Sequence, residues 1–206
     1  MKVSLFNSDQ FNIIQWAGGT SKQLYIYPET ATFSDRNFLF RISTAIITQY
    51  HSVFTLLPEI HRKLILLEGA LLIKHPGHYS TLLLPFETDT FNGAWNTESK
   101  GTGTDFNIMT TQNVNSRLRV LILETNQTAE IGSEEFYFLH LYIYKGSINL
   151  TLNQQEYLLS EGMSMMIESI KMPLQINSLS KSRIILSEFS IHTESRFKPL
   201  ILLHQF

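Results

Sequence analysis

The sequence contains no cysteine among its 206 residues. This absence excludes disulfide-stapled scaffolds, thiol-dependent catalysis and zinc sites with cysteine ligands. Charge of one sign is also scarce, because 16 basic residues nearly balance 18 acidic ones and the formal net charge is −2. A chain with so little net charge has no global field that would draw it to nucleic acid or to an anionic membrane. We therefore expect neither nucleic acid nor membrane as a partner.

Long apolar runs are missing as well. No apolar segment approaches the roughly 20 residues that a helix needs to cross a bilayer. The N-terminal residues MKVSLFNSDQF lack the apolar core of a signal peptide. From these two absences we predict a soluble, cytoplasmic protein.

Patterns typical of helices are few, and patterns typical of strands are many. The apolar segments are short, rich in β-branched and aromatic residues, and separated by turn residues, as in NFLFRISTAII, RLRVLILE and FYFLHLYIY. Segments of this length and spacing are typical of the strands of a β-sandwich or barrel. The polar, acidic segment ETNQTAEIGSEE indicates a connector. The sequence therefore predicts an all-β protein.

An internal repeat suggests how the strands are organised. The segment LLEGALLIK around Gly69 matches YIYKGSINL around Gly146, 77 residues later, and Pro85 precedes Gly162 by the same distance. A constant offset of this length predicts two similar β modules, as in a pair of RmlC-like cupin jelly rolls. A generic β-sandwich whose strands look alike by chance is the alternative. We predict a bicupin over residues 1–206, with a first module at about 1–123, a connector at 124–135 and a second module at about 136–206.

Five segments, in order, carry a resemblance to a known family. They are WAGGTSKQLYIYPE, NFLFRIS, LLEGALLIK, LPFETDTFNG and TDFNIMT. Together they resemble the HutD/Ves family of bacterial bicupins over the whole first module and more weakly over the second. The resemblance implies a small-molecule-binding bicupin with no established reaction. One branch of this family is associated with histidine utilisation and is proposed to sense a small acidic metabolite.

The chain departs from that branch at two places. Ala17 alone separates Trp16 from the glycines, where the branch has a longer turn with an extra Asn and Gly. Thr110 and Thr111 stand where the branch commonly has an arginine after the D-F-N-x-M motif. The ligand of that branch is therefore not carried over to this chain by the resemblance alone.

Histidine is the residue on which many cupin metal sites depend, through a His-x-His pair, a downstream Glu and a third His. This chain has seven histidines and no His-x-His pair; His75 and His78 are close, but they flank a Pro-Gly turn. A metal site needs three or four converging ligands, and the sequence offers no such set. We expect scattered surface or half-buried histidines, no metal and no other cofactor.

Polar residues interrupt two apolar strands of the first module. In NFLFRISTAII the alternation of a strand places Arg41 and Ser43 on one face, and in TDFNIMT it places Asp105 and Asn107 on one face. We predict that these four side chains face the interior of the first barrel. They could form a ligand site, because the planar fork of an arginine suits a carboxylate. They could equally form a closed Arg41–Asp105 ion pair that fills the barrel, since a buried guanidinium needs a partner.

The stretch WAGGTSK precedes an alternating strand-like run. Its two glycines permit positive φ angles and a close approach to another group, and its tryptophan could cap the mouth of the barrel. A plain Gly-Gly hairpin with a hydrophobic anchor is the alternative, and the resemblance favours a ligand-facing loop. The ligand-binding residues expected in this loop are Trp16, Gly18, Gly19, Thr20, Ser21 and Lys22.

Our leading hypothesis is a metal-independent binding module that senses or sequesters a small carboxylate metabolite in the first barrel. Arg41 would bind the carboxylate, while Ser43 and Asn107 would bond its polar edges. Asp105 would orient Arg41 or accept a hydrogen bond from the ligand. Arg62, beside a strand start, would be a weaker donor near the mouth.

Two other classes remain. One is a metal-free isomerase or hydrolase acting on a small acid, with Asp105 as acid or base, although Arg41 nearby should lower the pKa of Asp105 and make it a poor acid. The other is a partner protein acting through its surface, which leaves the polar interior unexplained. In the second module Ser182, Arg183 and Ile184 replace the Asp-Phe-Asn of the first. We expect that module to be structural or to form the surface of a homodimer.

Overall fold

The computed structural model describes residues 1–132, 136–170 and 173–192, and these residues form an all-β protein. Their strands make three antiparallel sheets of eight, five and four strands. Within this described part of the chain, no helix is long and apolar enough to cross a membrane. The prediction of an all-β fold is confirmed.

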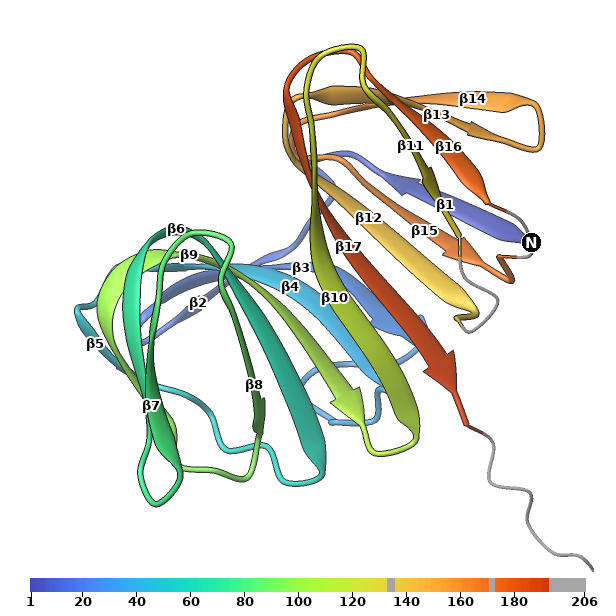
Figure 1. Cartoon of the computed structure of the whole chain (residues 1–206). Helices are drawn as coiled ribbons and strands as arrows, with labels where there is room; N and C mark the ends of the chain where they lie inside the picture. The colour runs from blue at the N-terminus through green and yellow to red at the C-terminus, as the bar shows by residue number, and fades with distance from the viewer. Residues whose placement is uncertain (133–135, 171–172, 193–206) are drawn as a thin grey trace, which may run out of the picture.

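The first sheet contains eight strands from the N-terminal half of the chain. Its path is β2-β3-β4-β9-β6-β7, with β5 also paired to β9 and β8 also paired to β6. The two long strands β6 and β9 pair along most of their length, with a bulge near Leu66, and carry the curved wall of one lobe (Figure 1). The strands are β2 (Ile13–Trp16), β3 (Gly19–Tyr27), β4 (Phe40–Ile47), β5 (His51–Val53), β6 (Ile60–His75), β7 (Tyr79–Leu83), β8 (Thr88–Asn92) and β9 (Glu98–Thr111).

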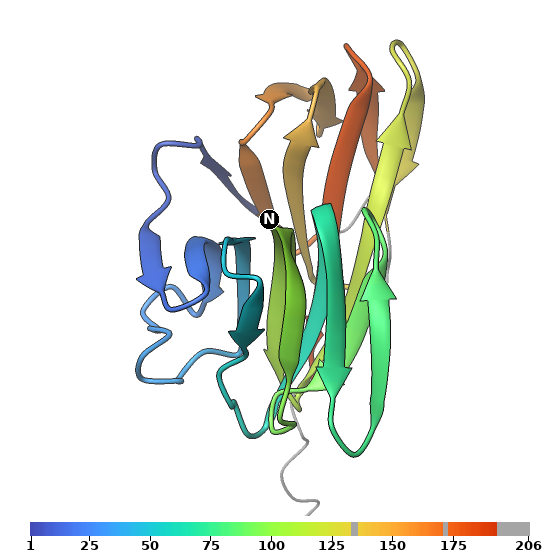
Figure 2. The same cartoon turned by 90° about the vertical axis from the view of Figure 1, so that its left-hand side faces the viewer.

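The other two sheets form the second lobe. The five-stranded sheet has the order β1-β15-β12-β17-β10, and the four-stranded sheet has the order β11-β16-β13-β14. Figure 2 shows the green strands of the first lobe below the orange and red strands of the second. The strands are β1 (Lys2–Phe6), β10 (Val114–Leu123), β11 (Thr128–Ile131), β12 (Phe138–Lys145), β13 (Ser147–Leu152), β14 (Gln155–Ser160), β15 (Ser164–Glu168), β16 (Leu174–Ser178) and β17 (Ser182–Ile191).

The strands of the two halves recur at the 77-residue offset seen in the sequence. β7 and β14 match at this offset to within one residue at each end, and so do β8 and β15. The pairing recurs as well, because β4 pairs with β9 as β10 pairs with β17. Gly69 and Gly146 both have positive φ angles, of 90° and 83°. The repeat is therefore seen both in the order of the strands and in the backbone conformation of these two glycines.

The sheets do not follow the module boundary expected near residue 123. β10 pairs with β17 along ten residues, so it opens the second lobe and does not close the first. β1, at the N-terminus, pairs with β15 and also belongs to the second lobe. The expected connector includes the strand β11, while its residues 133–135 lie outside the described part of the chain. The polar composition of this segment predicted a linker, whereas the backbone of β11 pairs with β16.

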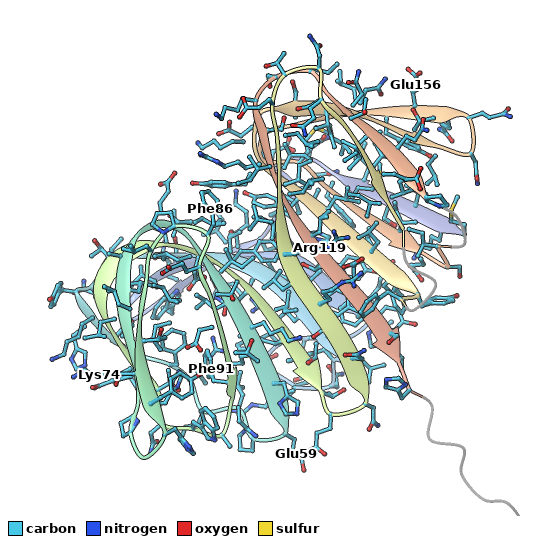
Figure 3. All side chains as sticks on the ribbon, viewed as in Figure 1. Glu59, Lys74, Phe86, Phe91, Arg119 and Glu156 are labelled. Carbon is cyan, nitrogen blue, oxygen red and sulfur yellow. The ribbon has the colours of Figure 1, made fainter. Side chains whose placement is uncertain are left out.

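Aromatic side chains join the two lobes. The rings of Phe40 in β4 and Phe189 in β17 stack with centroids 4.1 Å apart, and Phe138 packs against the edge of Phe40. Figure 3 labels Phe86 at the junction of the lobes, where its ring contacts Tyr144. The outer face of the first sheet is thus buried against the five-stranded sheet. Its inner face is left to enclose the interior of the first lobe.

The interior of the second lobe is filled by aliphatic side chains. Leu141, Ile167, Ile176 and Ile184 are among the fully buried members of this core. Ser182 lies at the end of β17 and bonds to Ser178 and to backbone carbonyls.

Candidate functional site

A cavity opens inside the first lobe, on the inner face of the eight-stranded sheet. Its volume is about 160 Å³, comparable to cavities that hold a six-membered ring. β2, β3, β4, β6 and β9 supply its floor and sides, and residues 53–57 cover it. The lining residues are Ile14, Trp16, Ser21, Phe33, Arg41, Ser43, Ala45, Ile47, Val53, Phe54, Thr55, Leu57, Arg62, Asp105, Asn107 and Met109.

The polar side chains of the cavity stand in rows set by strand register. Arg41 of β4 and Arg62 of β6 both pair with Met109 of β9, which lies between them. Ser43 pairs with Asn107 in the next row. Successive inward-facing residues of one strand are two positions apart, so the alternation predicted from the sequence places these residues on one face as expected.

Arg41 is held by hydrogen bonds within the protein. Its Nε donates to Gln23 Oε1 at 2.8 Å, and its Nη1 donates to Ser43 Oγ at 3.1 Å. Its guanidinium lies 4.5 Å from the centre of the Phe33 ring. Burial lowers the pKa of Arg41 to about 10, which leaves it charged at neutral pH. The sequence did not identify Gln23 as its partner.

Arg41 does not form the ion pair with Asp105 that the sequence left open. Among the described residues, no ion pair joins these two side chains. Arg41 lies opposite Met109 while Asp105 lies opposite Ala45. The guanidinium of Arg41 is bonded instead to Gln23 and Ser43, and the charge that acts on Asp105 is that of Arg62. The ion-pair alternative is therefore wrong.

Arg62 is the least satisfied charged group of the cavity. Its side chain is 5% exposed, and its Nε has no hydrogen-bond partner in the described structure. The guanidinium lies 4.8 Å from the ring centre of Phe54 and 5.2 Å from that of Phe91. Burial lowers the pKa of Arg62 to about 10, although the charge of Asp105 opposes this shift. From the sequence we expected Arg62 to be only a weaker hydrogen-bond donor near the mouth, whereas the structure places it in the wall of the cavity.

Asp105 and Asn107 form a pair on β9. Asn107 Nδ2 donates to Asp105 Oδ1 at 2.5 Å, while Asn107 Oδ1 is buried without a hydrogen-bond partner. Burial raises the pKa of Asp105 to about 7, against the lowering effects of Arg62, Asn107 and the backbone amide of Ala45. The expectation of a lowered pKa is therefore wrong. Complete burial outweighs one neighbouring guanidinium, and that guanidinium belongs to Arg62.

The β2–β3 hairpin places only part of the predicted loop at the cavity. Trp16 and Ser21 line it, whereas Gly18, Gly19, Thr20 and Lys22 do not. Lys22 lies over the Phe11 ring instead, at 5.8 Å from its centre. Strand alternation explains this outcome, because neighbours of an inward-facing residue such as Ser21 point to the opposite face.

The two glycines of the hairpin serve close packing. A Cβ at Gly18 would lie 2.0 Å from the Trp16 ring, and a Cβ at Gly19 would lie 1.9 Å from the carbonyl oxygen of Ile46. They therefore let the Trp16 ring fold over the turn and let β3 approach β4. The exposed lining residues are Ile14, Trp16, Val53 and Thr55, so the mouth of the cavity is mostly apolar.

Seven of the predicted ligand-binding residues thus meet at one cavity. Their role in binding stays a prediction. They are Trp16, Ser21, Arg41, Ser43, Arg62, Asp105 and Asn107. The sequence analysis missed Phe33 and Phe54, whose rings pack against the two guanidinia. In the sequence each of them is only an aromatic residue in a segment between strands. Such a position does not reveal which side chain the ring will contact.

Solved structures with the same fold are cupin-type proteins. PA5104 from Pseudomonas aeruginosa PAO1, a conserved protein of unknown function, is 16% identical with a TM-score of 0.81, and the match covers 92% of this chain and 100% of that one. HutD from Pseudomonas fluorescens SBW25 is 14% identical with a TM-score of 0.72, covering 93% and 100%. YhhW from Escherichia coli is 11% identical with a TM-score of 0.70, covering 94% and 100%. At these identities the likeness establishes the fold.

Some proteins of this fold hold a metal, as the nickel complex of the bacterial pirin YhhW shows. The cavity found here does not fit one. Its described lining offers one carboxyl group and no histidine, and Arg41 and Arg62 would repel a cation. Across the described residues, no three His, Cys, Asp or Glu side chains are grouped to hold a metal ion. His75 and His140 are fully buried, contrary to the expectation of surface or half-buried histidines.

The sequence itself identifies the family. No curated protein has a significant sequence match to this chain. The HutD family model matches residues 8–186, which include most of both lobes and every lining residue of the cavity. The chain therefore belongs to the HutD family.

Proposed function

We propose that this protein is a bicupin that binds a small carboxylate in the cavity of its first lobe. The observation that carries the proposal is the buried Nε of Arg62, a charged donor without a partner. An unpaired buried guanidinium is costly, and a carboxylate would supply the missing acceptor and charge. With two guanidinia against one carboxyl group, the described cavity has an excess of positive charge even when Asp105 is ionised.

The residues divide into a positioning set and a binding set. Gln23 and Ser43 fix Arg41 in place, so its guanidinium is pre-oriented before a ligand arrives. Arg62 lies against aromatic rings, and its buried Nε has no partner among the described residues. Binding by a pre-oriented charged donor loses less entropy on complex formation. Asn107 and Ser43 would then bond the remaining polar edges of the ligand.

The size of the cavity and the chemistry of its mouth indicate which small acids to test first. The HutD structure from Pseudomonas fluorescens SBW25 was obtained in a formate condition, and formate is the smallest carboxylate. The cavity has a larger volume than formate needs, and its mouth is mostly apolar, with Ile14, Trp16 and Val53 beside Thr55. A carboxylate with a short apolar body would use both parts of the cavity.

Calorimetric titration with sodium formate, acetate and benzoate tests the proposal. Sodium chloride at equal ionic strength controls for screening. We expect carboxylate binding to wild type, loss of binding in Arg62→Gln, and unchanged binding in Arg36→Gln. Arg36 is exposed and outside the cavity, so it matches the change of charge. Equal behaviour of the two variants, or no carboxylate binding at all, would overturn the proposal.

A metal-free isomerase or hydrolase is the second candidate, and one observation favours it. The pKa of Asp105 is raised to about 7, close to the value that suits a general acid or base at neutral pH. NMR spectra of added small acids in deuterated water would reveal exchange at carbon or a hydrolysis product. Signals that change with wild type but not with Asp105→Asn would support this candidate. Unchanged signals with both would favour the binding module.

The remaining predictions concern the setting of the protein. We keep the cytoplasmic location and a possible homodimer as proposals. The absence of nucleic-acid and membrane partners is also a proposal, supported by the small net charge of −2. Light scattering coupled to size-exclusion chromatography would test the homodimer directly. A mass equal to that of the 23.8 kDa chain would exclude it.

A further inference from the structure

We propose that the cavity binds its anion together with one proton, which Asp105 takes up as Asn107 turns its amide toward the ligand. This inference rests on the proposed binding of a small carboxylate. It adds a proton as a second ligand of the same site.

The geometry of the Asp105–Asn107 pair is the first support. An ionised carboxylate can only accept hydrogen bonds, so it requires the amide nitrogen of Asn107. That orientation is the one found, with Nδ2 donating to Asp105 Oδ1 at 2.5 Å. It leaves Asn107 Oδ1 buried and unpaired. An unpaired acceptor at the wall of an anion site is unfavourable for the anion.

Protonation of Asp105 would reverse this arrangement. A protonated carboxyl has one O–H donor, which can donate to Asn107 Oδ1 once the amide has turned by half a rotation. The amide keeps its shape in this turn, because its oxygen and nitrogen are nearly the same size. The Nδ2 of Asn107 would then be free to donate to a bound anion. Uptake of one proton would therefore pair the oxygen of Asn107 and leave its Nδ2 to donate to the anion.

Charge is the second support. The charged groups around Asp105 are Arg62 of β6 and, farther away, Arg41 of β4. No charge comes from the other described walls of the cavity, which are formed by β2, β3, β5 and the segment after β5. Protonation would therefore raise the net charge of the cavity from one positive to two positive. An anion would be bound more tightly by the second state.

The protonation of Asp105 is an equilibrium that a bound anion can shift near neutral pH. Burial already raises the pKa of Asp105 to about 7, so both forms of the carboxyl are present near neutral pH. A like charge nearby disfavours ionisation further. Because linkage is reciprocal, an anion that raises the affinity for the proton must itself bind more tightly when the proton is present.

Calorimetry of formate binding in buffers of different ionisation enthalpy counts the protons taken up. Formate stays ionised throughout the range from about pH 6 to about pH 8.5. We expect uptake near zero at the acid end and approaching one proton per formate at the alkaline end. Above the pKa of Asp105 the dissociation constant should rise about tenfold per pH unit.

Two variants make the test specific to Asp105. Asp105→Asn should bind formate with a dissociation constant that no longer depends on pH and with no proton uptake. Asp89→Asn makes the same change at a buried carboxyl on β8 that does not line the cavity, and it should keep the uptake of wild type. If Asp105→Asn does not fold, the ¹³C carboxyl shift of Asp105 in wild type must show a pKa that rises when formate is added.

The outcomes separate the two proposals. Formate binding without proton uptake at any pH would overturn the coupling and leave carboxylate binding intact. Proton uptake that persists in Asp105→Asn would also overturn it. The absence of formate binding across the whole range would overturn both proposals.

Discussion

Arg41 and Arg62 pair with the same residue, Met109, from opposite sides of β9. Two guanidinia thus stand in one row of the sheet, both buried and each packed against an aromatic ring. Only Arg41 is held by side-chain hydrogen bonds, to Gln23 and Ser43, whereas Arg62 Nε has no partner among the described residues. Equivalent positions in the sheet therefore serve different roles, and the difference leads to the first prediction.

Replacing Arg62 by methionine should stabilise the unliganded protein. Methionine fills a similar volume without the charged donor that the fold leaves unpaired, so the free energy of unfolding should rise by about 1–3 kcal/mol. Arg41→Met should have the opposite effect, because it removes the partner of Gln23 and Ser43. Urea denaturation of the two variants would measure the contrast. A loss of stability in Arg62→Met equal to that in Arg41→Met would show that Arg62 is a structural residue.

Two glycines with positive φ angles should differ in their tolerance of alanine. A Cβ at Gly69 would lie 2.1 Å from the carbonyl oxygen of Thr102, and the φ angle there is 90°. Gly77 has a similar φ of 84° but nothing within 4 Å of its Cβ position. Gly77→Ala should therefore cost only the backbone strain of about 1–2 kcal/mol.

Gly69→Ala should cost clearly more than Gly77→Ala, because β6 must move away from β9 to admit the new methyl group. The midpoints of urea unfolding would give both values. A similar cost at the two positions would mean that the bulge near Leu66 relaxes to accommodate a side chain.

The local sequence pattern predicts which face of each strand points into the cavity. It does not predict which side chains of different strands come into contact. Strand alternation depends only on neighbouring residues, so the sequence placed Arg41, Ser43, Asp105 and Asn107 on inward faces correctly. The distance between side chains on different strands depends on how the strands are paired, and alternation along one strand does not reveal that pairing. The alternative of a closed Arg41–Asp105 ion pair, which the sequence left open, was wrong, and the structure pairs Asp105 with Asn107 instead.

The same limit applies to the walls and boundaries of the site. Phe33 and Phe54 reach the cavity through segments between strands, whose course is decided by packing against the guanidinia and not by a sequence period. The module boundary was misplaced because nothing in the composition of β10 reveals its partner β17. The repeat, by contrast, was found because equivalent strands and glycine turns keep a constant spacing along the chain.

His140 should make the protein sensitive to acid. Its ring is fully buried, both nitrogens lack partners in the described structure, and burial lowers its pKa from 6.5 to about 3. Between these values the unfolded chain binds the proton and the folded protein does not, so stability must fall as the pH falls from 6.5 toward 3. The slope contributed by this one group approaches about 1.4 kcal/mol per pH unit.

Asp105 contributes a slope of the opposite sign. Its pKa rises from 3.8 to about 7 on folding, so the folded protein binds the proton more readily and stability falls as the pH rises through this range. His140→Gln should therefore gain relative stability on the acid side, and Asp105→Asn on the alkaline side. Unfolding free energies at several pH values would show both slopes. Parallel pH profiles for wild type and His140→Gln would contradict the burial of a neutral histidine.

Trp16 should report on occupation of the cavity by its fluorescence. It is one of two tryptophans, and it lines the mouth while remaining 36% exposed. Benzoate entering past its ring would change the polarity around the indole and hence its emission. Trp95 does not line the cavity, and its ring stacks on His78 with centroids 3.8 Å apart.

The two tryptophans provide matched variants for this measurement. Trp95→Phe should retain the emission change that benzoate causes in wild type, because Trp16 is still present at the mouth. Trp16→Phe should lose that change even where calorimetry still detects binding, since the remaining indole lies outside the cavity. The reverse pattern would place the bound acid near the β6–β7 turn and would remove the mouth of the cavity as its entrance.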